Sequence, residues 1–453
     1  MKALVVGCGK IGATIVSDLV DEGHDVVVID NDPQVIEKIT NIYDVMGVCG
    51  SGTDYDTLME AGAEGTELVI AVTSSDELNM LCCYISGRLG AKHTIARIRN
   101  PQYNIDNFGF LRQQLGISMA INPELLAARE IYNTLRFPNA AKTETFSQKN
   151  FEIIEIVLKE DSALTGIPLM QIRNKLKHNF LICAVQRDDK VYIPGGDFVL
   201  CKGDRIGFTA PITEAQKLMK DIGLDRKQAR NIMVIGGSRI AFYLTQLLMM
   251  SGNNVRLIEN SSEKCEELSS VLPPKTVIIN GDGAQQELLL EEGLNTTDAF
   301  VALTGMDEQN ILISVFASSK KVPKAIAKVN REELIPMAED LGLDSIVCPR
   351  KTVSNLVMRY ARALENSMGS NVETLYKIMN DKAEVLEFKA GSDFKKLGVP
   401  LKDLDLKNNI LIGGIIRDRK AIIPSGFDTF EKNDRVIVVA AGSRLNDLSD
   451  ILK

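Results

Sequence analysis

A glycine-rich loop near the start of the chain has residue types that could hold a phosphate. Gly7, Gly9 and Gly12 follow a short apolar run and open a helical pattern. In such a loop the first glycine permits a tight turn, the second lets the backbone approach a pyrophosphate, and the third lets helix and strand pack closely. The helix N-terminus then offers free N–H groups to the anion. The predicted phosphate-binding segment comprises Gly7, Cys8, Gly9, Lys10, Ile11 and Gly12.

An acidic residue follows the loop where a ribose would lie. Asp30 stands at the end of the next apolar run, Val26–Ile29. Its carboxylate could accept hydrogen bonds from the ribose hydroxyls, and it would repel a 2′-phosphate. The pattern therefore favours NAD or an adenosine ligand over NADP. The alternative is a glycine turn in a Rossmann-like sheet that binds nothing.

Further candidates follow later strands of the same predicted sheet. The carboxyl ends of parallel strands share one edge, so residues just after these strands should lie near the loop. The candidates are Gly50, Ser51, Gly52, Thr53, Thr73, Ser74 and Arg97. In Ala96–Arg99 the arginines alternate with apolar residues, which also fits a plain solvated strand edge. Arg97 is therefore open to either interpretation.

The second half of the chain repeats the first at an offset near 230 residues. Val5–Gly12 returns as Val234–Ala241, and Asp30 returns as Glu259. Repeats of this kind indicate a duplicated structural unit. The corresponding candidates of the second copy are Gly236, Gly237, Ser238, Arg239, Ile240, Glu259, Gly281, Asp282, Gly283, Thr304 and Lys328.

The second glycine loop departs from the first at two positions. Ser238 and Ala241 replace the second and third glycines, so we expect a more crowded approach for a phosphate. Lys10 and Arg239 occupy the same place in the two loops. Each could supply a cation to a terminal phosphate, or could be an ordinary solvated charge at a helix start.

Each repeat combines two kinds of unit. Short apolar runs alternate with helical patterns at first, which predicts a parallel sheet with helices on both faces. A helical stretch follows at 123–135 and again at 352–364, then a polar segment, 137–150, that we interpret as a linker. Short β-rich runs, with a small helix near 214–221, predict a smaller lobe.

The predicted fold class is therefore α/β, with two Rossmann-like doubly wound parallel-sheet domains, each followed by a small α+β lobe. The predicted divisions are a first Rossmann-like domain with its hinge helix at 1–139, a first small lobe at 140–225, a second Rossmann-like domain with its hinge helix at 226–369 and a second small lobe at 370–453.

Composition narrows the class of protein. Hydrophobic residues make up 45% and charged residues 25% of the 453 residues, the balance of an ordinary globular chain. The net charge is −8 and the basic residues are scattered, which argues against a nucleic-acid partner. The eight cysteines lack metal-ligand spacing, so we predict no metal site. No apolar stretch of membrane-spanning length and no signal-peptide pattern is found, so we expect a cytoplasmic protein.

Taken together, these motifs resemble the RCK domain, also called the KTN domain, and among such proteins the peripheral TrkA-type subunits of the Trk potassium-uptake system. The resemblance rests on Ala71–Glu77 with Asn79 and Met80, on Ala96–Pro101, on both small lobes and on the tandem duplication. It implies a non-enzymatic regulatory subunit that binds NAD(H) or ATP/ADP. It also implies a homo-oligomer, a dimer or tetramer forming a ring, beneath a membrane potassium transporter of the TrkH or TrkG type at the inner face of the plasma membrane. Ligand exchange would then gate potassium flow.

The resemblance also implies roles for particular residues. The loop from Gly7 to Gly12 would hold phosphates, with Lys10 facing a terminal phosphate and Asp30 at the ribose. Thr73 and Ser74 would lie on the phosphate or ribose side, and Arg97 would contact phosphates. Glu124 matches an acid that approaches the nucleotide or its metal ion in some relatives, whereas Arg350 takes its place in the second copy. This change and the altered second loop put equal ligand chemistry in the two halves in doubt. The small lobes would supply assembly contacts, although some relatives bind small effectors there.

Two other classes of protein share the glycine loop. A NAD-dependent dehydrogenase would need a substrate domain and a general acid or base. The two small lobes repeat each other and none of the three histidines has an evident catalytic partner in the sequence. A redox-sensing DNA-binding protein would need a helix-turn-helix with a basic recognition helix, and the sequence has no such pattern.

Overall fold

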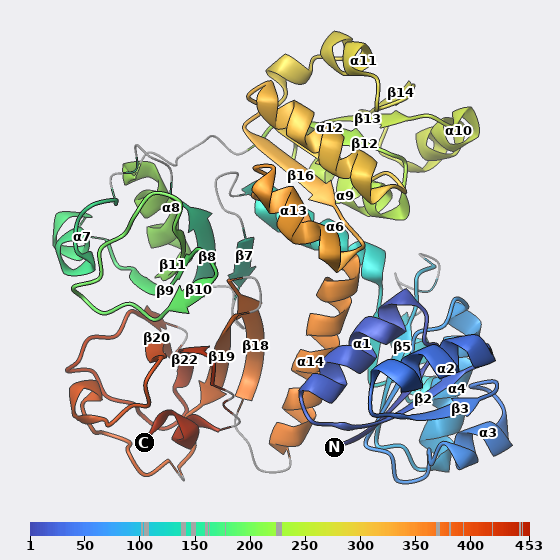
Figure 1. Cartoon of the computed structure of the whole chain (residues 1–453), viewed down its shortest axis with the longest axis horizontal. Helices are drawn as coiled ribbons and strands as arrows, with labels where there is room; N and C mark the ends of the chain where they lie inside the picture. Colours follow the sequence, from blue (N-terminus) through green and yellow to red (C-terminus); the bar gives the residue numbers. More distant parts are fainter. Residues whose placement is uncertain are drawn as a thin grey trace.

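The chain forms two sheet domains and two smaller lobes (Figure 1). The computed structural model describes residues 1–453 except 101–102, 104–107, 137–141, 146–150, 159–161, 163, 177, 223–228, 368–371, 380–381, 393, 419, 444 and 446. The predicted divisions after residues 139, 225 and 369 all fall in these gaps. They therefore stay predictions.

The first sheet is parallel, with the strand order β3-β2-β1-β4-β5-β6. Its strands are β1 (Lys2–Val6), β2 (Asp25–Asp30), β3 (Met46–Cys49), β4 (Leu68–Ala71), β5 (His93–Arg97) and β6 (Met119–Ile121). The helices that pack around it are α1 (Lys10–Asp21), α2 (Pro33–Ile42), α3 (Tyr55–Glu60), α4 (Asp76–Leu89) and α5 (Phe108–Leu115). Apolar clusters cover both faces of this sheet, as the continuous apolar strands predict.

The second sheet repeats this order as β14-β13-β12-β15-β16-β17. Its strands are β12 (Asn231–Ile235), β13 (Asn254–Glu259), β14 (Val277–Asn280), β15 (Ala299–Ala302), β16 (Lys324–Lys328) and β17 (Ile346–Val347). Its helices are α9 (Arg239–Met250), α10 (Ser262–Val271), α11 (Gln286–Glu291), α12 (Asp307–Ser319) and α13 (Ile335–Asp340), with 3₁₀ turns η2 (Leu294–Thr296) and η3 (Glu332–Leu334). The predicted pair of doubly wound sheets is confirmed. In this strand order the first and fourth strands of each sheet are neighbours, and the chain adds further strands outward in opposite directions from them. Rossmann-type sheets bind ligands at this point.

Each small lobe is built on a five-stranded antiparallel sheet, ordered β10-β9-β11-β8-β7 in the first and β18-β19-β22-β20-β21 in the second. The first lobe contains β7 (Lys142–Thr145), β8 (Phe151–Val157), α7 (Leu169–Leu176), β9 (Leu181–Arg187), β10 (Lys190–Tyr192), β11 (Arg205–Pro211) and α8 (Ile212–Asp221). The second contains β18 (Val372–Ile378), β19 (Ala383–Lys389), η4 (Leu401–Asp403), β20 (Ile410–Arg417), β21 (Lys420–Ile422), β22 (Arg435–Ala441) and η5 (Leu448–Ile451).

Two sequence interpretations of the lobes need correction. The polar segment 137–150, predicted to be a linker, contains strand β7, which pairs with β8. Helix α7 was not predicted, because its eight residues are too short to give a clear helical repeat. The expected helix near 214–221 is α8.

The long helices at the ends of the two sheet domains pack against the opposite repeat. Helix α6 (Pro123–Arg136) follows the first sheet, but Ala128 and Ile131 lie in the apolar cluster of the second sheet with Leu244 of α9. Helix α14 (Pro349–Ser367) follows the second sheet, and Val357 packs with Ile15 of α1. Figure 1 shows α14 running alongside α1. Each repeat therefore contributes a helix to the apolar core of the other repeat.

A buried ion pair strengthens one of these exchanged contacts. Arg362 of α14 is 5% exposed and donates hydrogen bonds to both carboxylate oxygens of Glu22, at 2.7 and 2.8 Å. The same guanidinium reaches Glu384 of the second lobe, at 3.0 Å. Removing one partner of a buried pair commonly costs about 3–5 kcal/mol. Arg362 thus ties the first sheet domain to the second repeat.

The two lobes pack with their sheets against each other. Phe151 of the first lobe lies against Gly414 of the second, where a Cβ would collide with its ring. The Thr209 hydroxyl donates a hydrogen bond of 2.7 Å to the Gly413 carbonyl. One apolar cluster spans both lobes. Each half of the duplicated chain therefore packs against the other at the sheet domains and at the lobes.

Candidate functional site

The first glycine loop joins β1 to α1 and meets the end of β4. Gly7 has φ +92°, and a Cβ there would lie 2.8 Å from the backbone nitrogen of Thr73. A Cβ on Gly12 would collide with the Gly7 carbonyl oxygen. These two glycines are therefore needed for the fold of the loop itself.

Gly9 has a different role from the other two glycines. No atom lies within 4 Å of the position that its Cβ would take, and its φ of −63° suits any residue. Gly9 is the N-cap of α1, and no side chain caps the helix there. An uncapped helix start leaves backbone N–H groups for an anion. The open space above Gly9 is where the sequence predicts a pyrophosphate.

Asp30 holds the loop from the end of β2. One carboxylate oxygen accepts a hydrogen bond of 2.7 Å from the Cys8 backbone, and the other accepts one of 3.0 Å from the Asp32 backbone. Burial, reinforced by the Asp30 charge, raises the pKa of the Cys8 thiol to about 12. Cys8 is therefore a protonated packing residue whose backbone, rather than its thiol, faces the site.

A buried asparagine that was not predicted as a site residue organises the edge of the sheet. The Asn79 side-chain oxygen accepts hydrogen bonds from the Thr73 backbone and hydroxyl, at 2.9 and 2.7 Å. Its amide donates to the Arg97 carbonyl at 2.9 Å. Asn310 makes the same contacts with Thr304 and Lys328. The recurrence of this asparagine in both repeats was the signal that could have identified it.

Arg97 points back toward the end of β4. It donates a hydrogen bond of 3.1 Å to the Thr73 carbonyl, while its buried Nε has no hydrogen-bond partner. Burial and the neighbouring charges of Arg99 and Arg239 lower the pKa of Arg97, against the opposing effect of Glu124. A guanidinium with one unpaired buried N–H and with like charges nearby is suited to an anionic ligand. The anion would accept a hydrogen bond from this N–H and would offset the repulsion between the positive charges.

Arg239 belongs to the other repeat. It begins α9 in the second glycine loop, yet its charge acts on Arg97 of the first. Tyr243, one turn further along α9, donates to the Arg99 carbonyl at 3.4 Å and accepts from Asn122 at 3.1 Å. The start of α9 therefore lies against the first site. The sequence did not predict this contact between the repeats.

Glu124 lies at the start of α6 and is held by Arg99. The Arg99 Nε donates to one carboxylate oxygen at 2.7 Å, and the other oxygen is buried without a hydrogen-bond partner. Among the described residues, no group of three or more histidine, cysteine or acidic side chains could hold a metal ion. Glu124 thus contributes one free acceptor beside Arg97, within an ion pair.

The remaining first-repeat candidates lie on the same edge. Ser51 and Thr53 share a hydrogen bond of 2.9 Å between their hydroxyls, in the loop after β3. Gly50 donates its backbone N–H to the Asp30 carbonyl at 2.9 Å, and a Cβ on Gly52 would collide with Val6. Ser74 and Lys10 are exposed. Ile11 is partly buried against the core.

The second glycine loop satisfies its own polar groups. The Ser238 hydroxyl caps α9 by accepting a hydrogen bond of 3.3 Å from Ala241. Glu259 is 6% exposed and accepts from the Gly237 backbone at 2.6 Å and the Ser261 backbone at 2.8 Å. Ile240 is buried in the core and Arg239 is exposed. Asp30 accepts two equivalent backbone hydrogen bonds, so the loops differ in the cap on the helix start and in the burial of the acid.

The other second-repeat candidates keep the positions of their counterparts. Gly236 has φ +93°, and a Cβ there would lie 3.1 Å from the backbone at Leu303 and Thr304. Lys328 replaces Arg97 and donates to the Thr304 carbonyl at 2.6 Å. Burial lowers the pKa of Lys328, and Asp307 opposes this shift.

The loop after β14 also repeats its counterpart. Gly281 donates to the Glu259 carbonyl at 2.9 Å, and a Cβ on Gly283 would collide with Ile235. Asp282 accepts a hydrogen bond of 2.9 Å from the Ala284 backbone. These positions reproduce the fold of the first edge.

The strand order and the paired glycine loops define the class: a tandem Rossmann-type protein with a small α+β lobe after each sheet. The TrkA-N domain family matches residues 3–123 and 232–349, and the TrkA-C domain family matches residues 153–223 and 385–453. The chain belongs to the TrkA family. No described helix is long and apolar enough to cross a membrane.

Relatives match over the whole length of the chain. A Trk system potassium uptake protein TrkA homolog of Archaeoglobus fulgidus is 31% identical over 453 residues, covering 100% of both chains. The Trk system potassium uptake protein TrkA of Vibrio alginolyticus is 27% identical and covers 97% of this chain and 95% of its own. These matches extend through both repeats.

Solved RCK structures share the fold. The GsuK RCK domain has a TM-score of 0.63 at 18% identity, covering 97% of this chain and 92% of its own. A GsuK channel bound to NAD has the same TM-score and covers 77% of its own chain. GsuK bound to ADP has a TM-score of 0.51 at 16% identity, covering 81% of this chain and 69% of its own.

Proposed function

We propose that this chain is a regulatory subunit of a Trk-type potassium-uptake system that senses an adenine nucleotide, NAD(H) or ATP/ADP, at its first glycine loop. The observation that carries the proposal is Arg97. Its Nε is buried without a hydrogen-bond partner, it donates to Thr73 next to the Gly7 turn, and two other arginine charges act on it. Such an arrangement suits phosphates.

Each part of the first site would have a definite role. The N–H groups at the start of α1 and the Arg97 guanidinium would hold the phosphates, and Asp30 would accept from the ribose. Cys8, Gly9 and Ile11 would approach through their backbones. The loop at 50–53, with Thr73 and Ser74, would border the ligand at the edge of the sheet.

The ligand would act at the contact between the repeats. Arg97 belongs to the first repeat and Arg239 to the second, and their like charges repel each other. An anion between them would remove this repulsion and favour their close approach. A ligand shifts an equilibrium between two arrangements only by its differential affinity for them, commonly about 1–3 kcal/mol. Two nucleotides that share the site could therefore act in opposite directions.

The comparisons support the assignment to potassium uptake. The matching relatives are Trk system potassium uptake proteins, and GsuK has been solved with NAD and with ADP. We infer a homo-oligomer, a dimer or tetramer in a ring, that sits at the inner face of the plasma membrane beneath a TrkH- or TrkG-type transporter.

A NAD-dependent dehydrogenase is the competing function. All three histidines lie elsewhere: His24 precedes β2, His93 begins β5 at the opposite edge of the sheet, and His178 lies in the first lobe. His178 is paired with Asp221 at 2.7 Å. None of them could serve as an acid or base beside Asp30. This placement favours a regulatory role.

Calorimetric titration with NADH, NAD, ATP and ADP tests the proposal. We expect at least one of these ligands to bind the wild-type chain and to lose affinity in Arg97→Gln. Binding of none of the four would contradict nucleotide sensing. Potassium uptake by cells that carry Arg97→Gln then tests whether binding controls transport.

A further inference from the structure

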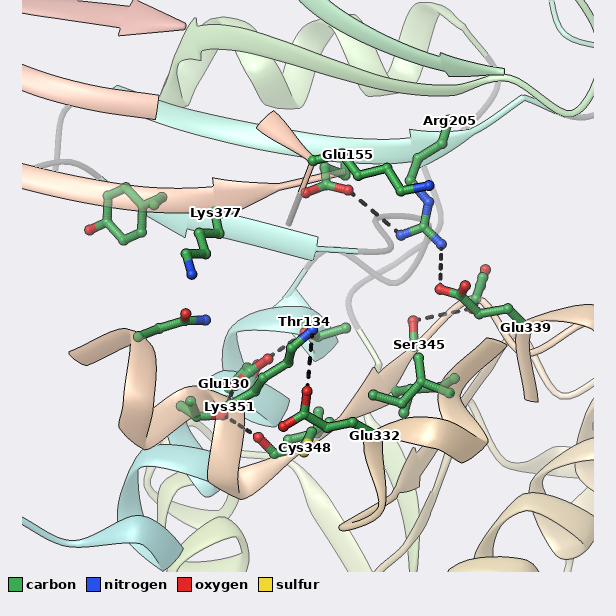
Figure 2. Close-up of a pocket in the computed structure, with 18 of the residues that line it drawn as sticks. Glu130, Thr134, Glu155, Arg205, Glu332, Glu339, Ser345, Cys348, Lys351 and Lys377 are labelled. Atoms are coloured by element: carbon green, nitrogen blue, oxygen red, sulfur yellow. Dashed lines mark hydrogen bonds and ion pairs between the residues drawn. The ribbon is translucent and has the colours of Figure 1, made fainter. Parts of the chain in front are cut away.

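A cavity in the structure lies apart from both glycine loops. This cavity of about 860 Å³ lies between the first lobe, the exchanged helices α6 and α14, the α13 region of the second sheet domain and strand β18 (Figure 2). No residue of either glycine loop lines it. Its volume falls within the usual range for a small-molecule site, about 300–1,000 Å³.

One wall of the cavity presents buried acceptor oxygens. Glu155 and Gln186 stand on the face of the first-lobe sheet that turns toward the second lobe. Glu155 is 2% exposed, and both it and Gln186 have a buried side-chain oxygen without a hydrogen-bond partner. Buried acceptors of this kind are rarely left unsatisfied in proteins. We therefore expect a molecule bound at this wall to supply hydrogen-bond donors.

The cation that the structure pairs with Glu155 is shared with a second carboxylate. The Arg205 guanidinium lies 3.6 Å from the unsatisfied oxygen of Glu155 and 3.0 Å from Glu339 of α13 (Figure 2). Arg205 therefore bridges two carboxylates and cannot fully compensate Glu155. A second positive group in the cavity would complete the pairing.

The crossing helices supply guanidinium groups to the cavity. Arg129 of α6 and Arg359 of α14 line it, and neither has an ion pair in the described part of the chain; Arg129 is exposed and Arg359 is partly buried. The Arg359 guanidinium lies over the Tyr376 ring, 5.0 Å from its centroid, which fixes its position. Figure 2 shows Lys377, on the same strand as Tyr376, pointing into the cavity. The partly buried Arg359 guanidinium, which has no carboxylate partner among the described residues, can bind an acid group.

A metal ion does not explain the cavity, because no described group of three or more ligand side chains could hold one.

We propose that the cavity binds a zwitterionic organic molecule. Its ammonium or guanidinium group lies at Glu155 and Gln186, and its carboxylate lies at Arg129 and Arg359. Ile335, Pro336 and Val347 add apolar atoms to the lining. Such a ligand contacts a lobe, both exchanged helices and the second sheet domain, so it acts as an effector separate from the nucleotide.

Two matched sets of probes test the ligand class by calorimetry on the full chain. The first set is L-arginine with agmatine, which lacks the carboxylate. The second is 6-aminohexanoate with 1,6-diaminohexane and adipate, which carry only one kind of charged group. We expect at least one zwitterion to bind at least about tenfold more tightly than its single-charge analogues. Equal binding of the analogues, or no binding of either zwitterion at about 10 mM, would overturn the proposal.

Variants assign the two ends of the ligand. Arg359→Gln should weaken binding of the zwitterion and leave any weak binding of agmatine unchanged, whereas Glu155→Gln should weaken both. Arg88→Gln is the matched control, because Arg88 also lies over a tyrosine ring, at 5.4 Å, but does not line the cavity. Thermal unfolding of each variant checks the fold. Equal affinity in wild type and Arg359→Gln would refute the assignment. The titrations are repeated in Asp30→Ala, so that a failure here and a failure of nucleotide binding are separable.

Discussion

The two glycine loops occupy equivalent places in equivalent sheets, yet they treat their polar groups differently. The first helix start has no side-chain cap, and the acid at the end of β2 is partly accessible. In the second, Ser238 caps the helix and Glu259 is almost fully buried. The two acids accept equivalent backbone hydrogen bonds, so the loops differ in the helix cap and in the exposure of the acid. A shared fold therefore does not require a shared function.

The acids at the ends of β2 and β13 give the largest expected difference. Asp30→Ala should weaken nucleotide binding by about 10- to 100-fold, because a charge-assisted hydrogen bond contributes about 1.5–3 kcal/mol. Glu259→Ala should leave the affinity of the first site unchanged. Calorimetry with the tightest-binding nucleotide measures both. If the two variants lost affinity equally, the halves would be functionally equivalent and the comparison would fail.

The middle glycine offers a second test, in which the first loop is given the residue of the second. Gly9→Ser places a side chain in space that is open in the structure, so the Tm should not fall. The same side chain would meet a pyrophosphate, and we expect about tenfold weaker binding. A drop in Tm without a change in affinity would show that Gly9 serves folding instead.

Arg239 tests whether the second repeat helps the first. Arg239→Gln should weaken nucleotide binding at the first site by a few-fold, in line with about 0.2–1 kcal/mol for an exposed charge, and high salt should reduce the difference. Arg350→Gln is the control, since Arg350 is also a second-repeat arginine but lies at the start of α14 rather than at the start of α9. Identical affinities in wild type and Arg239→Gln would mean that the repeats do not cooperate at this site.

The smallest effect is expected at Ser238. Ser238→Gly restores the glycine of the first loop and removes the cap of α9, which should cost only a few tenths of a kcal/mol. Urea unfolding monitored by circular dichroism measures the change. If the variant also gained a second bound nucleotide in calorimetry, Ser238 alone would account for the difference between the loops.

Much of this organisation was predictable from the sequence because it depends on local pattern. The glycine at position 7 predicts a positive φ, and the apolar runs at residues 3–6 and 26–29 predict buried parallel strands. Because the second half of the chain repeats the motifs of the first, the second sheet could be predicted from the first. Strand β7 was missed because the short segment Lys142–Thr145 is polar and edge strands need little apolar character.

The rest depends on contacts between distant parts of the chain. Nothing near Arg239 in the sequence indicates that its charge reaches Arg97, because the two belong to different repeats. The packing of α6 on α9 is equally invisible, since an amphipathic helix shows which face is apolar but not what covers it. The same holds for the cavity, whose walls come from widely separated parts of both repeats.

The exchanged helices α6 and α14 have a consequence for how such a chain diverges. Two separate copies would meet only as their concentrations allowed, and any sequence change would appear in both. Joined in one polypeptide, the halves meet at an effective concentration of about the millimolar range. Their stoichiometry is then fixed at one to one by translation. A mutation in one half is therefore always paired with an unmutated partner, so one loop can specialise in structure while the other keeps its chemistry.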